Sequence, residues 1–297
     1  MNILIIGAKG FIGSHLAEFY RSRNHRVISC DIKDLKEADY FAVDKYNSDF
    51  HPVFTSYQID ACVFAGGNGS VPFSIENPEI DFQLNTHTVD SVLVAMRKHS
   101  PECRFIHISS AAVYGSPSKL PIDENETVKP LSPYGWHKYL SECLCRKYHS
   151  LYGMRTSSIR VFSVFGERLR KQLFWDIFQK IKKSRDILLF GSGKESRDFI
   201  YISDLVQAID CVLRNGAFKA EAVNVASGEE ITIRTAATAF CRLYDPALRV
   251  SFTNEVKPGD PSNWWADISR LRGLGFHPSV SLEQGLGNYV KWLKENE

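Results

Sequence analysis

Three glycines near the start of the chain restrict its fold more than any other feature. Gly7, Gly10 and Gly13 lie between the apolar run 2–6 and a helical pattern over 11–23. In a strand–loop–helix unit, the first glycine allows a tight turn, the second lets the backbone approach a pyrophosphate, and the third lets the helix pack closely on the strand. Free N–H groups at the helix start then face the phosphate charge. The segment, with Phe11 and Ile12 inside it, therefore predicts a βαβ unit that binds a dinucleotide.

An acid stands where such a unit contacts the ribose. The next predicted strand is 26–30, and Asp31 follows it, 18 residues after Gly13. A carboxylate at this position accepts hydrogen bonds from a ribose diol and repels a 2′-phosphate. NAD is therefore the expected cofactor. Lys33, close by, keeps NADP as the less favoured alternative.

Short apolar runs and helical patterns alternate along the first half of the chain. The predicted strands include 60–64, 104–108 and 155–161, and the predicted helices include 79–99 and 134–151. This alternation predicts an α/β fold, a Rossmann-type, doubly wound parallel sheet with helices on both faces. We expect an NAD-binding Rossmann domain with the catalytic residues over 1–165. We expect a small C-terminal α/β lobe for the substrate over 166–297, some segments of which return to the first domain.

Composition restricts the setting and the partners. The formal net charge of the 297 residues is only +2, so the charge balance calls for neither nucleic acid nor a membrane surface. No apolar stretch reaches the roughly 18 residues that a transmembrane helix needs. The seven cysteines are scattered, without a Cys-x-x-Cys pair, which indicates a reducing, cytoplasmic setting. No residues show metal-ligand spacing, so no metal is expected.

A Tyr-x-x-x-Lys pair provides candidate acid–base chemistry. Tyr134 and Lys138 share one face of their predicted helix. The ammonium is expected to lower the pKa of the phenol, which can then exchange a proton with a substrate hydroxyl while a hydride moves. Ser110 follows a predicted strand, 24 residues before Tyr134, and is expected to bond the same substrate oxygen. His137, between the two, is interpreted as structural or exposed. The helix 202–214 that follows later is expected to have Ser203 as its N-cap.

Longer strings strengthen this interpretation. In chain order they are Ser109–Gly115, Pro133–Gly135, Arg160–Gly166, Gly191–Gly193, Arg197–Tyr201, Asn224–Gly228 and Pro258–Asp260. With the glycine loop, they resemble the extended short-chain dehydrogenase/reductases, in particular the NAD-dependent epimerase/dehydratase family. The resemblance runs from Met1 to about Trp292. It implies an NAD domain, a lobe that grips a nucleoside diphosphate sugar, and a homodimer built on helices 79–99 and 134–151.

The resemblance also assigns roles to single residues. Asp44 and Lys45 are implied near the adenine, and Ala65 and Asn85 on the cofactor and active-site wall. The implied substrate contacts are Ser110, Ser163, Arg197, Lys257 and Asp260. Arg197 is expected to hold the diphosphate, because a guanidinium pairs well with phosphate, unless it pairs with the neighbouring Glu195 or Asp198. Ser163 and Lys257 stand where relatives more often carry Asn and Arg, so these two positions differ from the usual substrate-binding residues.

Two alanines narrow the reaction that the resemblance implies. The 4,6-dehydratases of this branch carry an Asp-Glu pair directly after the central hydroxyl residue. The sugar-acid decarboxylases carry a Glu at the position of Ala112, and the 3,5-epimerase/reductases carry a Cys at the position of Ala111. Here Ala111 and Ala112 stand there, and alanine transfers no protons. The preferred prediction for the function is a nucleotide-sugar 4-epimerase. A 4-keto-sugar reductase or a 4-dehydrogenase is the alternative, since the chain is rather short for the epimerases. A non-enzymatic NAD-sensing regulator is less favoured, because Ser110, Tyr134 and Lys138 are all present.

Overall fold

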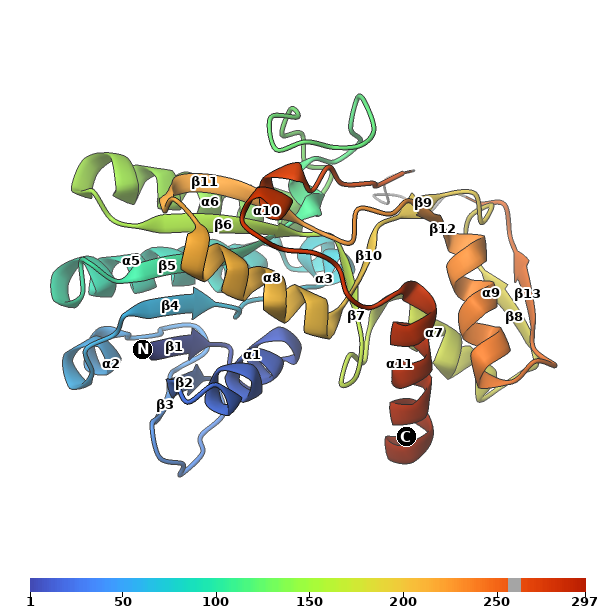
Figure 1. Ribbon diagram of the computed structural model, residues 1–297, viewed down its shortest axis with the longest axis horizontal. Helices are drawn as coiled ribbons and strands as arrows, with labels where there is room; N and C mark the ends of the chain where they lie inside the picture. The colour runs from blue at the N-terminus through green and yellow to red at the C-terminus, as the bar shows by residue number, and fades with distance from the viewer. Residues whose placement is uncertain (256–262) are drawn as a thin grey trace.

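A seven-stranded parallel sheet forms the centre of the computed structural model, which describes residues 1–255 and 263–297 (Figure 1). The strand order is β11-β6-β5-β4-β1-β2-β3. The strands are β1 (Asn2–Ile6), β2 (Arg26–Asp31), β3 (Tyr40–Ala42), β4 (Ala61–Phe64), β5 (Arg104–Ser110), β6 (Thr156–Val161) and β11 (Lys219–Val225). The order reverses beside β1, which pairs with both β2 and β4. The predicted doubly wound α/β fold is thus confirmed, and loops gather at the carboxyl ends of these strands.

Helices cover both faces of this sheet and create two apolar clusters. On one face lie α1 (Phe11–Ser22) and α8 (Ile202–Asn215), in front of the sheet in Figure 1. On the other face lie α2 (His51–Ser56), α5 (Thr88–His99) and α6 (Pro133–Tyr152). Because both faces are covered, the central strands are buried without alternation: every residue of β4 and of β6 is buried, although β6 carries four polar side chains.

The C-terminal part consists of three two-stranded sheets beside the helices α7, α9 and α11, at the right of Figure 1. The paired strands are β7 (Ser163–Phe165) with β10 (Phe199–Tyr201), β8 (Asp186–Leu189) with β13 (Arg249–Phe252), and β9 (Ser196–Arg197) with β12 (Ile231–Thr232). The helices are α7 (Gln172–Ile181), α9 (Ile233–Tyr244) and α11 (Leu282–Asn296). The short helix α10 (Ser269–Gly273) instead packs on β11 of the large sheet and on α8 (Figure 1). One apolar cluster runs from the sheet into this part, so the two pack on a shared core. The chain returns to the large sheet through α8 and β11.

Two expected helices differ from the prediction. The helix expected at 79–99 is interrupted by a π-helical turn, η1 (Gln83–His87), between α4 (Pro78–Phe82) and α5. The N-cap expected at Ser203 is wrong, because α8 begins at Ile202 and Tyr201 is its N-cap. The neighbouring Asp204 is buried and accepts hydrogen bonds from the backbone N–H groups of Ser279 and Val280. Asp204 at this helix start therefore makes a tertiary contact.

Candidate active site

Tight packing explains the glycines of the β1–α1 turn. Gly7 has φ +83°, and a Cβ there would lie 2.7 Å from the backbone nitrogen of Gly66. A Cβ on Gly13 would lie 2.0 Å from the carbonyl oxygen of Gly7. Gly10 is the N-cap of α1, which starts at Phe11 and continues through Ile12. The free N–H groups of α1 therefore open onto a backbone cradle that any side chain would fill.

Asp31 lies at the mouth of this cradle, as the last residue of β2. Its Oδ2 accepts a hydrogen bond from the backbone N–H of Lys9 at 2.8 Å, and its Oδ1 accepts one from Ile32 at 2.8 Å. A carboxylate oxygen has two acceptor sites, so both oxygens keep capacity for a ribose diol. The cradle and this acid together fit a dinucleotide without a 2′-phosphate.

Asp44 and Lys45 lie in the loop after β3, next to the strand that ends at Asp31. The Asp44 carboxylate accepts hydrogen bonds from the backbone N–H groups of Tyr46 and Asn47, and these bonds lower its pKa. The Lys45 ammonium lies over the Tyr46 ring, 5.0 Å from its centroid. The N–H of Val43 donates to the carbonyl of Asp31 at 3.0 Å, which holds the start of this loop at the same sheet edge as the cradle.

The candidate catalytic residues meet where β5 ends and α6 begins. Ser110 is the last residue of β5, and the short helix η2 (Ala111–Val113) follows it. Gly135 lets α6 approach this turn, because a Cβ there would lie 2.6 Å from the carbonyl oxygen of Ala112. The buried Ser74 of α3 (Val71–Glu76) accepts a hydrogen bond from the backbone N–H of Tyr134 at 3.1 Å. The Pro-Tyr-Gly string is therefore a packing requirement of the site.

The electrostatics of Tyr134 differ from the expectation. Burial raises the pKa of Tyr134 to about 12, and the hydrogen bond with Ser110 opposes this rise. Burial also lowers the pKa of Lys138 to about 8. The Lys138 ammonium lies 5.9 Å from the centroid of the Tyr134 ring and donates a hydrogen bond to the carbonyl of Ile108 at 3.0 Å. The expected lowering of the phenol pKa by Lys138 is not found in the protein alone, where desolvation dominates and Asp81 adds to the rise.

Ala65 and Asn85 lie on the wall beside the cradle. Ala65 follows β4 and donates its N–H to the carbonyl of Ile6 at 2.9 Å. Asn85 belongs to η1, and its Oδ1 faces Gly67, where a Cβ would lie 2.5 Å away. That oxygen is buried without a hydrogen-bond partner among the described residues, so a donor from a bound ligand could complete its bonding.

Sequence reasoning missed Asp81, which lies behind this wall. Its fully buried carboxylate accepts hydrogen bonds from Asn85 Nδ2 at 2.9 Å and Asn68 Nδ2 at 2.6 Å, and pairs with His137 Nδ1 at 2.5 Å. His137 is largely buried, so its interpretation as structural fits and as exposed does not. The four-residue spacing of Asp81 and Asn85 on one helix face was the available signal.

The expected substrate residues lie apart from the catalytic pair in the chain. Ser163 begins β7, and Arg197 lies in β9. The Arg197 guanidinium lies over the Trp264 ring, 5.5 Å from its centroid, and donates a hydrogen bond to the carbonyl of Ser196. Its neighbours are bonded elsewhere: Glu195 accepts from Ser192 and Gly193, and Asp198 from Ser227 and Gly228. Lys257 and Asp260 lie outside the described residues.

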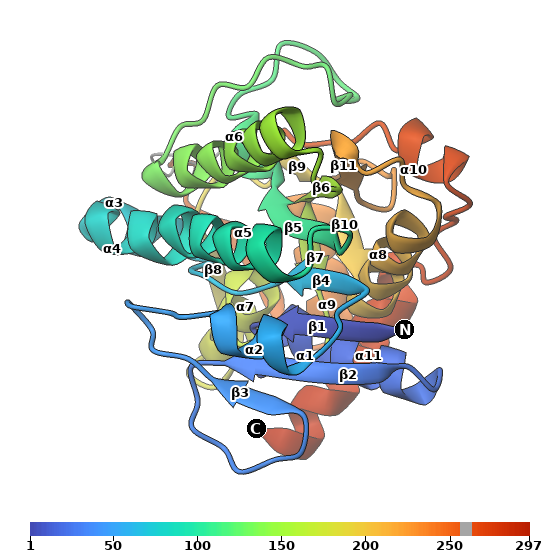
Figure 2. The same ribbon diagram turned by 90° about the vertical axis from the view of Figure 1, so that its left-hand side faces the viewer.

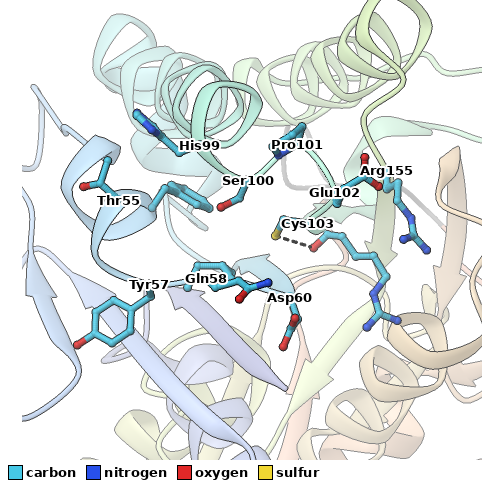
Figure 3. A pocket seen from close by; sticks show the side chains of 13 residues that line it. Thr55, Tyr57, Gln58, Asp60, His99, Ser100, Pro101, Glu102, Cys103 and Arg155 are labelled. Carbon is cyan, nitrogen blue, oxygen red and sulfur yellow. Dashed lines mark hydrogen bonds between the residues drawn. The ribbon is translucent and has the colours of Figure 1, made fainter.

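A cavity of about 540 Å³ lies at the opposite edge of the sheet (Figure 3). It is lined by residues that precede β4, β5 and β6, among them Gln58, Asp60, Cys103 and Arg155. Burial raises the pKa of the Cys103 thiol, which keeps it in the unreactive form. This cavity is therefore separate from the residues that carry the candidate chemistry.

Within residues 1–255 and 263–297, no helix combines the length and apolarity needed to cross a bilayer. Nor do they hold a group of three or more His, Cys, Asp or Glu side chains arranged for a metal ion.

Comparison with known proteins agrees with this geometry. The sequence model of the NAD dependent epimerase/dehydratase family matches residues 3–226. The chain is 30% identical to the "Uncharacterized UDP-glucose epimerase YtcB" of Bacillus subtilis over 99% of its length and 98% of that protein. It is 28% identical to a UDP-glucuronate 4-epimerase of Thermodesulfobacterium geofontis over 99% and 96%. The crystal structure of the UDP-glucuronic acid 4-epimerase of Bacillus cereus, in complex with UDP-glucuronic acid and NAD, superposes with a TM-score of 0.89 at 26% identity over 100% of both chains. The chain belongs to the NAD-dependent epimerase/dehydratase family.

Proposed function

We propose that this protein is an NAD-dependent nucleoside diphosphate sugar 4-epimerase. The observation that carries the proposal is the meeting of Ser110, Tyr134 and Lys138 at the same sheet edge as the Gly7–Gly13 cradle. The residues beside Ser110 are Ala111 and Ala112, and Ala111 is buried in η2. This arrangement offers one acid–base group next to a dinucleotide cradle and no second proton donor in η2, as oxidation and reduction at one carbon require.

The side chains divide the proton chemistry among them. When bound, NAD takes up and returns a hydride. As a phenolate, Tyr134 accepts the proton of the sugar hydroxyl when the carbon is oxidised, and as a phenol it returns that proton when the carbon is reduced. The Lys138 ammonium stabilises the phenolate, and the Ser110 hydroxyl bonds the same substrate oxygen. Because oxidation and reduction cancel, a 4-epimerase needs no net supply of cofactor.

The remaining site residues complete the proposal. Asp31 would bind the ribose diol of NAD, and Asp44 and Lys45 would lie at its adenine. Ala65 and Asn85 would line the wall, and Gly10, Phe11 and Ile12 the pyrophosphate. Arg197 would hold the diphosphate of the sugar nucleotide, with Ser163 at the sugar, because guanidinium groups bind phosphate in charge-assisted hydrogen bonds.

Turnover without added cofactor tests this proposal. The purified protein is incubated with UDP-glucose, UDP-glucuronate or UDP-N-acetylglucosamine, and the 4-epimers are separated by chromatography. Epimer formation without added NAD, together with NAD released on denaturation, supports the epimerase. Stoichiometric consumption of NADH or NADPH on a nucleoside diphosphate 4-keto sugar, without epimerisation of these three substrates, would instead identify a 4-keto-sugar reductase. No turnover of any nucleotide sugar would refute the enzyme assignment.

We further propose a homodimer through α5 and α6, which lie side by side in Figure 2. Apolar side chains are exposed on this face: Phe82 on α4, Val94 on α5, and Trp136 and Leu140 on α6. Such a patch of large apolar groups favours association. Sedimentation should show a dimer, and Trp136→Glu should shift it to monomer with an intact fold. A wild-type monomer at micromolar concentration would contradict this interface.

A cytoplasmic location accords with the cysteines. All seven are free thiols, and five of them are buried. Free thiols of this kind are typical of a reducing compartment.

A further inference from the structure

Asp81 lies at a junction of four segments around the catalytic helix. Its own helix is α4, and its three hydrogen-bond partners come from the loop after β4 (Asn68), from η1 (Asn85) and from α6 (His137). The side chain is fully buried, and no Lys or Arg pairs with it among the described residues. A buried carboxylate without a strong cation is costly, so such a group persists where it has a use.

The π-helical turn η1 joins this junction to the catalytic helix. Thr86 donates a hydrogen bond to the carbonyl of His137 at 3.0 Å, and Ser141 donates to the carbonyls of Asn85 and His137 at 2.9 and 2.8 Å. Single π-helical turns inside α-helices occur often at functional sites. Here the turn places Asn85 beside Gly67 while Asp81 holds the side-chain amide.

His137 connects the junction to the acid–base pair. It stands three residues after Tyr134 and directly before Lys138, and its ring is held by Asp81 on one side and the Phe82 ring, 5.5 Å away between centroids, on another. A shift of Asp81 would therefore move the turn of α6 that carries Lys138.

We propose that Asp81, clamped by His137, is a positioning residue for Tyr134 and Lys138: its buried carboxylate fixes the catalytic helix against the cofactor wall and brings a negative charge into the surroundings of that pair. The proposal rests on the proposed function only in assigning that pair to catalysis. The geometry of the junction stands without it.

The charges around the pair support this role. Asp81 raises the pKa of Lys138, whereas burial and Lys171 lower it. The Lys171 ammonium lies over Gly69, where a Cβ would be 2.6 Å from it. Other titratable side chains also lie on the elements packed around the pair. Glu76 on α3 and Glu79 on α4 are exposed, and His87 on η1 bonds Gln83. His107 on β5 is fully buried, and burial together with Lys138 holds its pKa well below the usual value, whereas the buried Glu142 of α6 pairs with Arg160. Asp81 is thus the acid that opposes Lys171 at Lys138.

Asp81→Asn isolates the charge from the geometry. The amide oxygen can still accept from Asn68 and Asn85, and the new NH₂ can donate to His137 Nδ1 in the tautomer protonated at Nε2. Loss of the Asp81 charge should lower the pKa of Lys138, and also that of Tyr134, because Asp81 raises both. The whole kcat–pH profile should therefore move about one pH unit lower. Lys171→Met should raise the pKa of Lys138, because Lys171 lowers it.

The controls separate this role from a structural one. Asp176→Asn removes an exposed acid of α7 that pairs with Lys180, and should leave the profile unchanged. Isotope labelling of the lysine ε-carbons with ¹³C, read by NMR and assigned with Lys138→Arg, follows the protonation of the buried Lys138 without turnover, so it decides the proposal even if the proposed function fails. In Asp81→Asn, Lys138 should lose its proton at lower pH than in the wild type.

Superimposed profiles and titration curves for Asp81→Asn and the wild type would overturn the proposal. Asp81→Ser, which leaves room for a bridging water, replaces Asp81→Asn if that variant does not fold. If neither neutral variant folds, the carboxylate serves folding and the proposal fails. His137→Ala removes the donor to Asp81 and should lower kcat, whereas His137→Asn keeps a donor and should restore part of the loss. Equal losses in these two variants would contradict the clamp.

Discussion

The cofactor edge and the C-terminal lobe are built on different principles. At the cofactor edge, the positions of Gly7, Gly13 and Gly135 follow from backbone atoms, since a Cβ at each would lie between 2.0 and 2.7 Å from another backbone atom. In the lobe, the strands form three separate pairs, and Arg197 is placed by the Trp264 ring and the Ser196 carbonyl.

This difference indicates which of the two sites tolerates substitutions and which does not. A site fixed by backbone contacts tolerates few substitutions and serves one ligand, the dinucleotide. A site made of side chains on short strands and loops can change its substrate by a few replacements. Three variants should break or sharpen this contrast.

The largest effect is expected at Tyr134. Tyr134→Phe removes the proton acceptor while keeping the ring, so kcat should fall about a thousandfold. Circular dichroism and bound NAD should be unchanged. Tyr139→Phe, one turn further along the same helix, should keep near-normal activity. If Tyr134→Phe retained a tenth of the wild-type kcat, Tyr134 would not be the acid–base group.

A smaller effect, on folding, is expected at the cofactor cradle. A Cβ on Gly13 would meet a carbonyl oxygen that cannot rotate away, so Gly13→Ala should lower the free energy of unfolding by about 2 kcal/mol and release NAD. Urea denaturation and absorbance of the released cofactor measure both. The matched control is Gly287→Ala, since Gly287 lies in α11 with nothing within 4 Å of a Cβ, and it should be neutral or stabilising. Equal losses in both variants would contradict the cradle.

The smallest effect is expected in the lobe. Arg197→Lys keeps a charge but loses the planar fork, so KM for the nucleotide sugar should rise about tenfold while kcat changes little. Arg234→Lys, in α9 beside the Phe252 ring, is the control in the same lobe. A change in kcat alone would place Arg197 at the reacting atoms and would contradict the division between a catalytic edge and a substrate-binding lobe.

The short elements of the fold were beyond sequence reasoning. The helices α2 and α3 and the strands β3 and β13 were not predicted, because runs of three to six residues give weak periodicity and are stabilised by their neighbours. The π-helical turn η1 was missed for the same reason: Thr86 and Ser141 hold it, and these bonds join residues distant in sequence. The twelve-residue helix α9 was also missed, although its buried residues recur at helical spacing.

The long elements and the candidate cofactor and catalytic positions were accessible from the sequence alone. Glycines with no room for a Cβ, an acid after β2, and a tyrosine and lysine one helical turn apart are local requirements, so they appear as spacing. The tertiary structure alone decided the proton affinities and the role of Asp81. Burial moved the pKa of Tyr134 up and that of Lys138 down, and no local pattern carries the desolvation that adjoining segments impose.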